Sequence, residues 1–212
     1  RQIGKTASIE HFAQNYEYFI NINFSLESKY KTICSDSFDA DAVIKNISRI
    51  DPSKKFVVGK TLILFDEIQD YPEIATTLKS FCLSGKFDVI CSGSMLGVNY
   101  KKIQSNSVGY KSEYSMQSLD FEEFLWAKGY GKDDIEELLS HMKSGEPFNQ
   151  TTLSVFNELF LDYCILGGMP KVVSNYIKKG TFEGSLELQH ELINDYKEDI
   201  KKYVDGIEKT RV

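Results

Sequence analysis

The sequence predicts an α/β fold in which a parallel sheet flanked by helices is followed by a smaller, mostly helical domain. Short apolar runs suit strands that are buried on both faces, and helical segments alternate with these runs through about residue 94. After residue 119 the apolar residues show mainly helical spacing. We place the boundary near residue 115, which gives domains over residues 1–115 and 116–212.

Apolar spacing places the first elements of the α/β domain. Residues 7–16 are expected to form a helix, and residues 18–24 are predicted to form a strand because apolar and polar side chains alternate there. Asp39 or Asp41 can cap a second helix, since either carboxylate can accept hydrogen bonds from the first amides of that helix. The polar segment between the predicted strand and this second helix predicts a connecting loop.

A buried strand followed by two carboxylates is the central feature of this domain. The apolar run 62–65 leads directly into Asp66 and Glu67. Such a run suits a strand of a parallel sheet, and open α/β sheets bind ligands at the carboxyl ends of their strands. Paired carboxylates at that place predict a bound cation or polar substrate, although the same residues could form an ordinary acidic turn before Pro72.

The pattern of helix and strand then repeats. A helix is predicted from Pro72 onward, with Cys82 on its apolar stripe. Residues 87–91 are a second candidate for a buried strand, which leads into the stretch 92–94 of sequence Ser-Gly-Ser. Because Cys82 and Cys91 both lie in apolar runs, we expect their thiols to be buried.

Caps and apolar spacing predict the helical second domain. Asp120 and Glu123 are spaced as a capping box, which marks the start of a helix with an apolar face. Further helices are indicated over residues 154–166 and 192–204. We expect the apolar residues of the helix that starts at Asp120 to pack in a core or a domain interface: Phe121, Phe124, Leu125 and Trp126.

The first residues of the chain carry a phosphate-binding pattern. Gly4-Lys5-Thr6 matches the last three positions of the loop G-x-x-x-x-G-K-[ST]. In that loop the glycine lets the backbone close on the phosphates, the lysine contacts the β and γ oxygens, and the hydroxyl binds Mg²⁺. A helix after Thr6 would direct its first amides at the anion. The first glycine of the pattern would lie two residues before Arg1, so we expect a fragment that lacks at least one strand.

Composition is that of an ordinary globular protein of 212 residues. The net charge is -6 and the pI is about 5.2, which disfavours nucleic acid as a partner. The cysteines show no Cys-x-x-Cys spacing and the histidines lie far apart, so these residues predict no metal site. No apolar run reaches the length of a membrane span and no signal peptide opens the chain, so we expect a cytoplasmic protein.

Several stretches together resemble a known family. Arg-Gln-Ile-Gly-Lys-Thr, Leu-Phe-Asp-Glu-Ile-Gln, Ser-Gly-Ser, Leu-Asp-Phe-Glu-Glu-Phe-Leu and Gly-Gly-Met-Pro occur in this order. The order resembles that of prokaryotic AAA+-like P-loop ATPases in which an AAA domain is followed by a DUF4143 domain. The resemblance covers nearly the whole chain, and its last two stretches are the more particular ones. It implies a P-loop NTPase fold that uses ATP and Mg²⁺.

The resemblance also implies roles for individual residues. Asp66 looks like the carboxylate on the magnesium side, and Glu67 looks like the general base that activates the attacking water. Ser92 or Ser94 matches the polar sensor of the γ-phosphate, with an ordinary turn as the alternative. The resemblance implies that Thr6 and Asp66 hold the metal and that the following residues bind the nucleotide: Gln2, Ile3, Gly4, Lys5 and Thr6.

The sequence departs from this family in one catalytic feature. Many relatives have a Gly-Arg pair before the Phe-Glu-Glu-Phe stretch, where this chain has Gly109-Tyr110, and no arginine lies between Arg49 and Arg211. An arginine finger accelerates hydrolysis about 10³–10⁵-fold in GTPases. We therefore expect Mg²⁺-dependent ATP hydrolysis that is slow and coupled to domain movement.

Two other functions also fit the sequence. A non-catalytic nucleotide switch or scaffold would bind ATP and present a surface to a partner protein or to another copy of the chain. A DNA-associated ATPase is disfavoured by the net charge, although the family's C-terminal domain, expected after Val212, could carry that function. ATP rather than GTP is inferred from the resemblance, since the sequence shows no base-reading motif.

Overall fold

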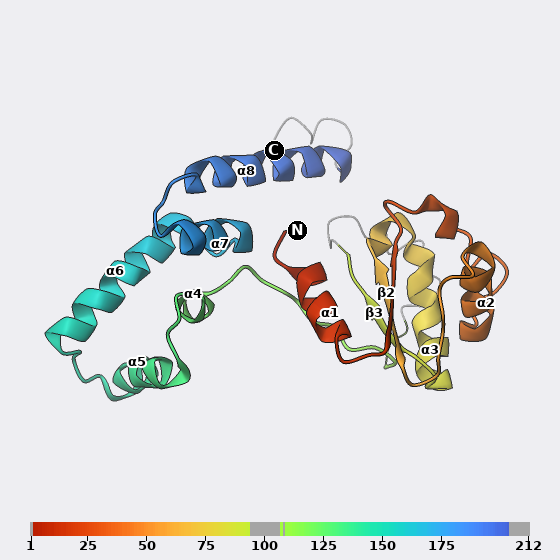
Figure 1. The fold of residues 1–212 in the computed structure, drawn as a ribbon, viewed down its shortest axis with the longest axis horizontal. Helices are drawn as coiled ribbons and strands as arrows, with labels where there is room; N and C mark the ends of the chain where they lie inside the picture. Colours follow the sequence, from red (N-terminus) through yellow and green to blue (C-terminus); the bar gives the residue numbers. More distant parts are fainter. Residues whose placement is uncertain (1, 94–106, 108, 204–212) are drawn as a thin grey trace. The chain divides into compact units, whose positions relative to one another are not determined.

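The computed structural model describes residues 2–93, 107 and 109–203, and Figure 1 shows its fold. The chain divides into two compact units, of which one is Lys5–Ser115 and the other is Met116–Val212 together with Arg1–Gly4. The first unit contains a parallel sheet with helices, and the elements described from Met116 onward are helical. The predicted fold class is therefore confirmed.

The sheet has three parallel strands in the order β1-β2-β3. They are β1 (Tyr18–Asn23), β2 (Thr61–Asp66) and β3 (Asp88–Cys91). All six residues of β2 are buried, as expected for a middle strand that is covered on both faces. The pairing aligns Asn23 with Asp66 and Phe65 with Cys91, so the three strands end together at one edge of the sheet.

One face of the sheet packs against α2 (Ala40–Ile50) and α3 (Leu78–Ser84). The core on this face combines isoleucine and phenylalanine side chains of the strands with apolar side chains of both helices: Ile20, Ile22, Ile63, Phe65, Val43, Ile47 and Phe81. Because side chains alternate along a strand, the side chains of Leu62, Leu64 and Asp66 lie on the opposite face.

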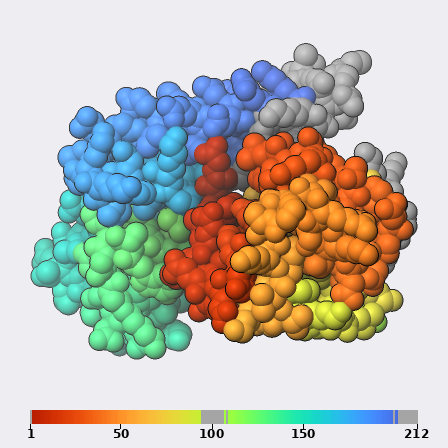
Figure 2. Space-filling model, turned by 45° about the vertical axis from the view of Figure 1, so that its right-hand side comes forward, coloured from red at the N-terminus to blue at the C-terminus, as the bar shows by residue number. Residues whose placement is uncertain are grey.

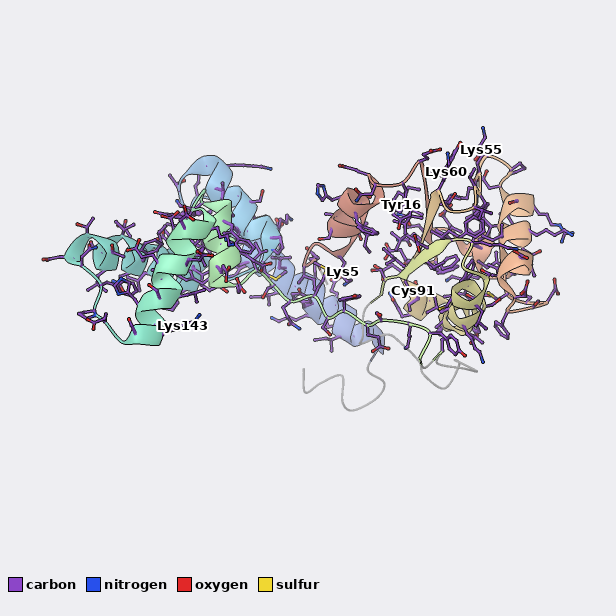
Figure 3. All side chains as sticks on the ribbon, turned by 90° about the horizontal axis from the view of Figure 1, so that it is seen from below. Lys5, Tyr16, Lys55, Lys60, Cys91 and Lys143 are labelled. Carbon is purple, nitrogen blue, oxygen red and sulfur yellow. The ribbon has the colours of Figure 1, made fainter. Side chains whose placement is uncertain are left out.

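Helix α1 (Lys5–Ala13) lies on the side of the strands opposite to α2 and α3, as Figures 1 and 3 show. Tyr16, which follows α1, donates a hydrogen bond to Asp88 Oδ2 at 2.7 Å. This bond and burial raise the pKa of Tyr16 to about 12. The red segment in Figure 2 shows that α1 contributes to the molecular surface. Asp66 thus shares a face of the sheet with the helix that carries Lys5.

The structure corrects three details of the sequence-based prediction in this unit. Helix α1 begins at Lys5 instead of residue 7, directly after Gly4 at φ 90°. The helix predicted from Pro72 is divided, because Pro72–Thr77 is a 3-10 helix (η3) that precedes α3. Cys82 is exposed, since its neighbour Phe81 takes the inward position on α3.

The structure also determines the N-cap of α2 and the burial of the cysteines in this unit. Asp39 is the N-cap of α2, and its carboxylate accepts hydrogen bonds from the amides of Asp41 and Ala42 at 3.0 and 3.2 Å. Cys91 is partly buried, whereas the buried cysteine is Cys34. Burial raises the pKa of the Cys34 thiol to about 12, so it stays protonated at neutral pH.

The helical unit is built from α4 (Phe121–Ala127), α5 (Lys132–Ser144), α6 (Gln150–Leu166), α7 (Pro170–Lys179) and α8 (Ser185–Tyr203). The predicted capping box at the start of α4 is present. Asp120 accepts a hydrogen bond from the Glu123 amide at 2.8 Å, and Glu123 accepts one from the Asp120 amide at 3.0 Å. All five helices contribute to one apolar core: Phe124, Leu125, Ile135, Leu159, Leu166, Val172, Val173, Tyr176 and Leu192.

The two most particular stretches of the family resemblance contact each other in this unit. The Leu119 amide donates to the Gly168 carbonyl at 2.8 Å, and the Tyr163 hydroxyl donates to the Leu119 carbonyl at 2.9 Å. A Cβ atom at Gly168 would lie 1.9 Å from the Leu119 oxygen, which no side chain could tolerate without a backbone shift. The glycine is therefore required where the end of α6 meets the entry to α4.

The aromatic face of α4 is buried in part. Phe124 and Leu125 lie in the core, and Phe121 packs against it. Trp126 is 53% exposed, so the expectation of core packing is wrong at this residue. Trp126 lies on the solvent side because the helix turns it away from the face that carries Phe124.

Replacing Phe124 by alanine should therefore destabilise the protein far more than replacing Trp126. Phe124 is fully buried, so Phe124→Ala should lower the free energy of unfolding by about 3–5 kcal/mol. Trp126→Ala is the matched control and should cost less than about 1 kcal/mol. Urea unfolding of both variants measures the difference, and equal losses would contradict the assigned core.

Candidate nucleotide site

Three polar residues lie side by side at the carboxyl edge of the sheet. Asn23 pairs with Asp66, and the Ser92 amide donates to the Phe65 carbonyl at 2.9 Å, which continues the β2–β3 register by one residue. Because side chains alternate along each strand, Asn23, Asp66 and Ser92 all lie on the face opposite to the α2–α3 core. This row is the polar end of a face that is otherwise apolar at Leu62 and Leu64.

The Asp66 carboxylate is held by donors on both of its oxygens. Oδ2 accepts a hydrogen bond from Asn23 Nδ2 at 3.1 Å, and Oδ1 accepts one from the Glu67 amide at 3.0 Å. Asp66 is only 6% exposed, so these donors replace water that burial has removed. Asn23 is itself fixed, because its Oδ1 accepts from the amides of Ser25 and Leu26. The position of the Asp66 carboxylate is thus set before any ligand binds.

Glu67 leaves the strand in a left-handed conformation, with φ 54° and ψ 47°. This region is sparsely populated for residues with a side chain, so the surrounding structure must hold it. The Ile68 amide donates to the Ser92 carbonyl at 3.1 Å, and the Asp70 amide donates to the Glu67 carbonyl at 3.0 Å. The Glu67 carboxylate accepts a hydrogen bond from Gln69 Nε2. The turn therefore directs Glu67 away from the strand direction that Asp66 follows.

Ser92 has a buried hydroxyl that makes no hydrogen bond to any part of the chain that the structure describes. The residue is 6% exposed, and an unsatisfied buried hydroxyl is costly. A ligand or water beside Asp66 would provide the missing partner. Ser94, the other candidate sensor, lies outside the described residues.

The predicted phosphate-binding residues lie immediately before α1 and in its first turn. Lys5 and Thr6 are the first residues of the helix, where backbone amides lack helical partners and can bind an anion, and Figure 3 labels Lys5 there. Gly4 has φ 90° and Gln2 has φ 57°, so the chain turns tightly before the helix. Gln2, Ile3 and Gly4 are grouped with the helical unit, in which Gln2 Nε2 donates to Asp195 Oδ2 at 2.8 Å.

The types of donor at the site are compatible with a magnesium ion that also binds phosphate oxygens. The described residues contain no group of three or more His, Cys, Asp or Glu side chains that could hold a metal ion. Magnesium usually takes one or two carboxylates from the protein and completes its octahedron with phosphate oxygens and water. The hydroxyl of Thr6 and the carboxylate of Asp66 are donors of the kind that magnesium accepts, and the Ser92 hydroxyl, which has no hydrogen-bond partner among the described residues, belongs to the same row as Asp66.

Sequence reasoning missed Asn23 and the contact between Gln69 and Glu67. A signal for Asn23 was available, because Asn23 ends an alternating strand on the same face as Asn21. The signal did not say which residue of the neighbouring strand would lie opposite it. Gln69 gave no periodic signal, since it lies in a turn whose conformation depends on Glu67.

Together, the parallel sheet, the Gly-Lys-Thr stretch that leads into α1 and the Asp-Glu pair at the end of β2 are the features of a P-loop nucleotide-binding protein. The family model described as "AAA domain" matches residues 1–125. The chain therefore belongs to this family of P-loop nucleotide-binding ATPases. No curated protein and no solved structure matches the sequence. Among the described residues, every helix is too short or too polar to cross a membrane.

The row of Asn23, Asp66 and Ser92 predicts a pH-dependent effect of Asn23→Asp. The new carboxylate can still accept from Ser25 and Leu26, but it can no longer donate to Asp66 and would face a like charge. At pH 7 the variant should lose roughly 2–4 kcal/mol of unfolding free energy. The loss should shrink as the pH falls toward 4, because protonation of the introduced carboxyl removes the repulsion and restores a donor toward Asp66.

Urea unfolding between pH 4 and 7 measures this effect. Asn157→Asp, at an exposed position of α6, is the control, and its stability should follow that of the wild type at every pH. A loss for Asn23→Asp that does not change with pH would contradict the contact between residue 23 and Asp66.

Proposed function

We propose that the protein binds ATP with Mg²⁺ and hydrolyses it slowly, and that hydrolysis is coupled to movement of a helical domain over residues 116–212 against a P-loop core over residues 1–115. The observation that carries the proposal is the unsatisfied Ser92 hydroxyl beside the preset Asp66 carboxylate, on the face of the sheet that α1 occupies. A polar row of this kind, next to a helix that starts with Gly-Lys-Thr, supports binding of a polyphosphate.

Each residue of the proposed site has a distinct task. Lys5 and the amides at the start of α1 would bind the β- and γ-phosphates, and Thr6 and Asp66 would hold Mg²⁺. Magnesium supplies positive charge that offsets the charge of the phosphates. Ser92, or Ser94 outside the described residues, would contact the γ-phosphate through a neutral hydroxyl.

Glu67 is proposed as the general base. The oxygen of a water molecule forms a bond to the γ-phosphorus, the bond to the bridging oxygen of ADP breaks, and a proton of that water passes to the Glu67 carboxylate. Asp66 and Glu67 can share this site because the left-handed turn at Glu67 separates the directions of their side chains. General-base catalysis of this type typically contributes about 10²–10⁴-fold.

We expect ATP hydrolysis to be slow because of where arginine residues lie in the sequence. Nothing between Arg49 and Arg211 supplies a guanidinium group, so an arginine finger would have to come from elsewhere. A partner protein or a second copy of the chain could provide one in trans.

A nucleotide switch is the second candidate function, and the absence of arginine from the sequence between Arg49 and Arg211 favours it. Such a switch needs Lys5, Thr6 and Asp66 but does not need Glu67 as a base. It would bind ATP and present a surface to a partner protein. A DNA-associated ATPase is less favoured, because the net charge of -6 gives no overall attraction for a phosphate backbone.

Replacing Lys5 by alanine should weaken ATP binding strongly. Lys5 is the cation that the motif places against the phosphates, and charge-assisted hydrogen bonds of this type contribute about 1.5–3 kcal/mol, or roughly 10–100-fold in Kd. Calorimetry on the full-length protein in Mg²⁺ measures the affinity. Lys143→Ala, at an exposed lysine of α5, is the control and should bind ATP like the wild type. Unchanged affinity in Lys5→Ala would exclude the P-loop assignment.

Replacing Glu67 by glutamine should separate the enzyme from the switch. Glutamine keeps the size of the side chain but removes the basic carboxylate, so ATP affinity should persist while single-turnover hydrolysis falls about 10²–10⁴-fold. Equal and measurable rates in the two proteins would exclude Glu67 as the base. Binding without turnover in both proteins would instead support the switch.

A further inference from the structure

Gln69 is in direct contact with the proposed general base. Its Nε2 atom donates a hydrogen bond to Glu67 Oε2, and the residue is only 9% exposed. The Gln69 amide is buried, whereas the Glu67 carboxylate that it contacts is more exposed. The bond therefore ties the carboxylate to the protein interior and is not an incidental contact at the surface. We propose that Gln69 is a positioning residue that orients the Glu67 carboxylate for proton transfer from the attacking water. This inference rests on the proposed ATP hydrolysis and deepens it.

The environment of Gln69 fixes its amide in one place. Ile68, one residue before it, is anchored to the end of β3 by the 3.1 Å bond from its amide to the Ser92 carbonyl. On the other side Gln69 packs against Gly93, where an added Cβ atom would lie 2.8 Å from Gln69 Oε1 and 3.0 Å from Ile68 Cγ1. Gly93 therefore leaves the space that the amide occupies, and Ser92 and Gly93 support Glu67 through Ile68 and Gln69.

The chemistry of an amide suits this position. A glutamine donates a hydrogen bond without bringing a positive charge, so it can fix one carboxylate oxygen and leave the carboxylate its full negative charge. A lysine or arginine at the same place would form an ion pair and compete with the water for the base. Glu67 Oε1 accepts no hydrogen bond from the described residues, so the second oxygen can receive the proton.

Gln69→Met tests the proposal, because methionine has nearly the same length and shape but cannot donate. Melting and ATP affinity should stay near the wild-type values, whereas kcat should fall roughly 10–100-fold, as expected when a reacting group loses its orientation. Gly93→Ala should lower kcat in the same direction, because its methyl group would displace the amide. Gln150→Met, at an exposed residue of α6, is the matched control and should leave kcat unchanged.

A double-mutant cycle separates positioning from a general structural effect. If Gln69 acts through the Glu67 carboxylate, Gln69→Met should cost nothing further once Glu67 is replaced by glutamine. An equal loss in both backgrounds would overturn the inference, and so would faster turnover in Gln69→Met, which would mean that the amide restrains the base.

Failure of the inference can be told from failure of the proposed function. Turnover that is lost in Glu67→Gln but retained in Gln69→Met would overturn the positioning role alone. Absence of turnover in the wild type would overturn the hydrolytic function and the positioning role together. Equal and measurable turnover in the wild type and Glu67→Gln would overturn the base role of Glu67 and with it the positioning role of Gln69, while ATP hydrolysis itself would stand. If Gln69→Met lowers turnover only when residue 67 is glutamate, and ATP affinity is unchanged, the result would support both the hydrolytic function and the positioning role.

Discussion

The burial of β2 on both faces is the constraint on which the rest of the sheet domain depends. Each of its six residues is inside, so the strand can carry apolar side chains until the point where it leaves the sheet. Asp66 occupies that point, and its carboxylate lies on the face that does not hold the α2–α3 core. The alternation that buries Phe65 against Phe81 on one face therefore also places Asp66 toward α1 on the other.

Burying a carboxylate at the end of a strand costs free energy, and hydrogen bonds from the segments on either side offset that cost. Asn23 supplies a donor from β1, the backbone of Glu67 supplies a second, and β3 holds the following turn through the Ser92 carbonyl. These bonds also explain how Glu67 keeps its left-handed backbone conformation, because both the strand before it and the turn after it are anchored. A conformation of this type at a site residue indicates that the direction of its side chain matters.

Local pattern was enough to predict the strands, the Asp66–Glu67 pair at a strand end and the Asp120 cap, because each depends on residues close in sequence. The position of Asn23 opposite Asp66 depends on the register between strands, which the pattern of a single strand does not contain. Cys82 was predicted to be buried because it follows Phe81 in an apolar run, yet adjacent residues on a helix point in different directions and only Phe81 faces the core. The required space at Gly93 and Gly168 likewise arises from segments that are distant in sequence.

The charges of the site support a ligand that brings its own cation. Asp66 and Glu67 are adjacent, and among the described residues the side chains that donate hydrogen bonds to them, Asn23 and Gln69, are neutral amides. Within the described residues neither carboxylate takes part in an ion pair. Two carboxylates that are oriented but not neutralised attract positive charge, and the same charges would repel a bare polyphosphate. A nucleotide that arrives with a divalent cation satisfies both conditions, because the cation can contact the carboxylate and the phosphates together.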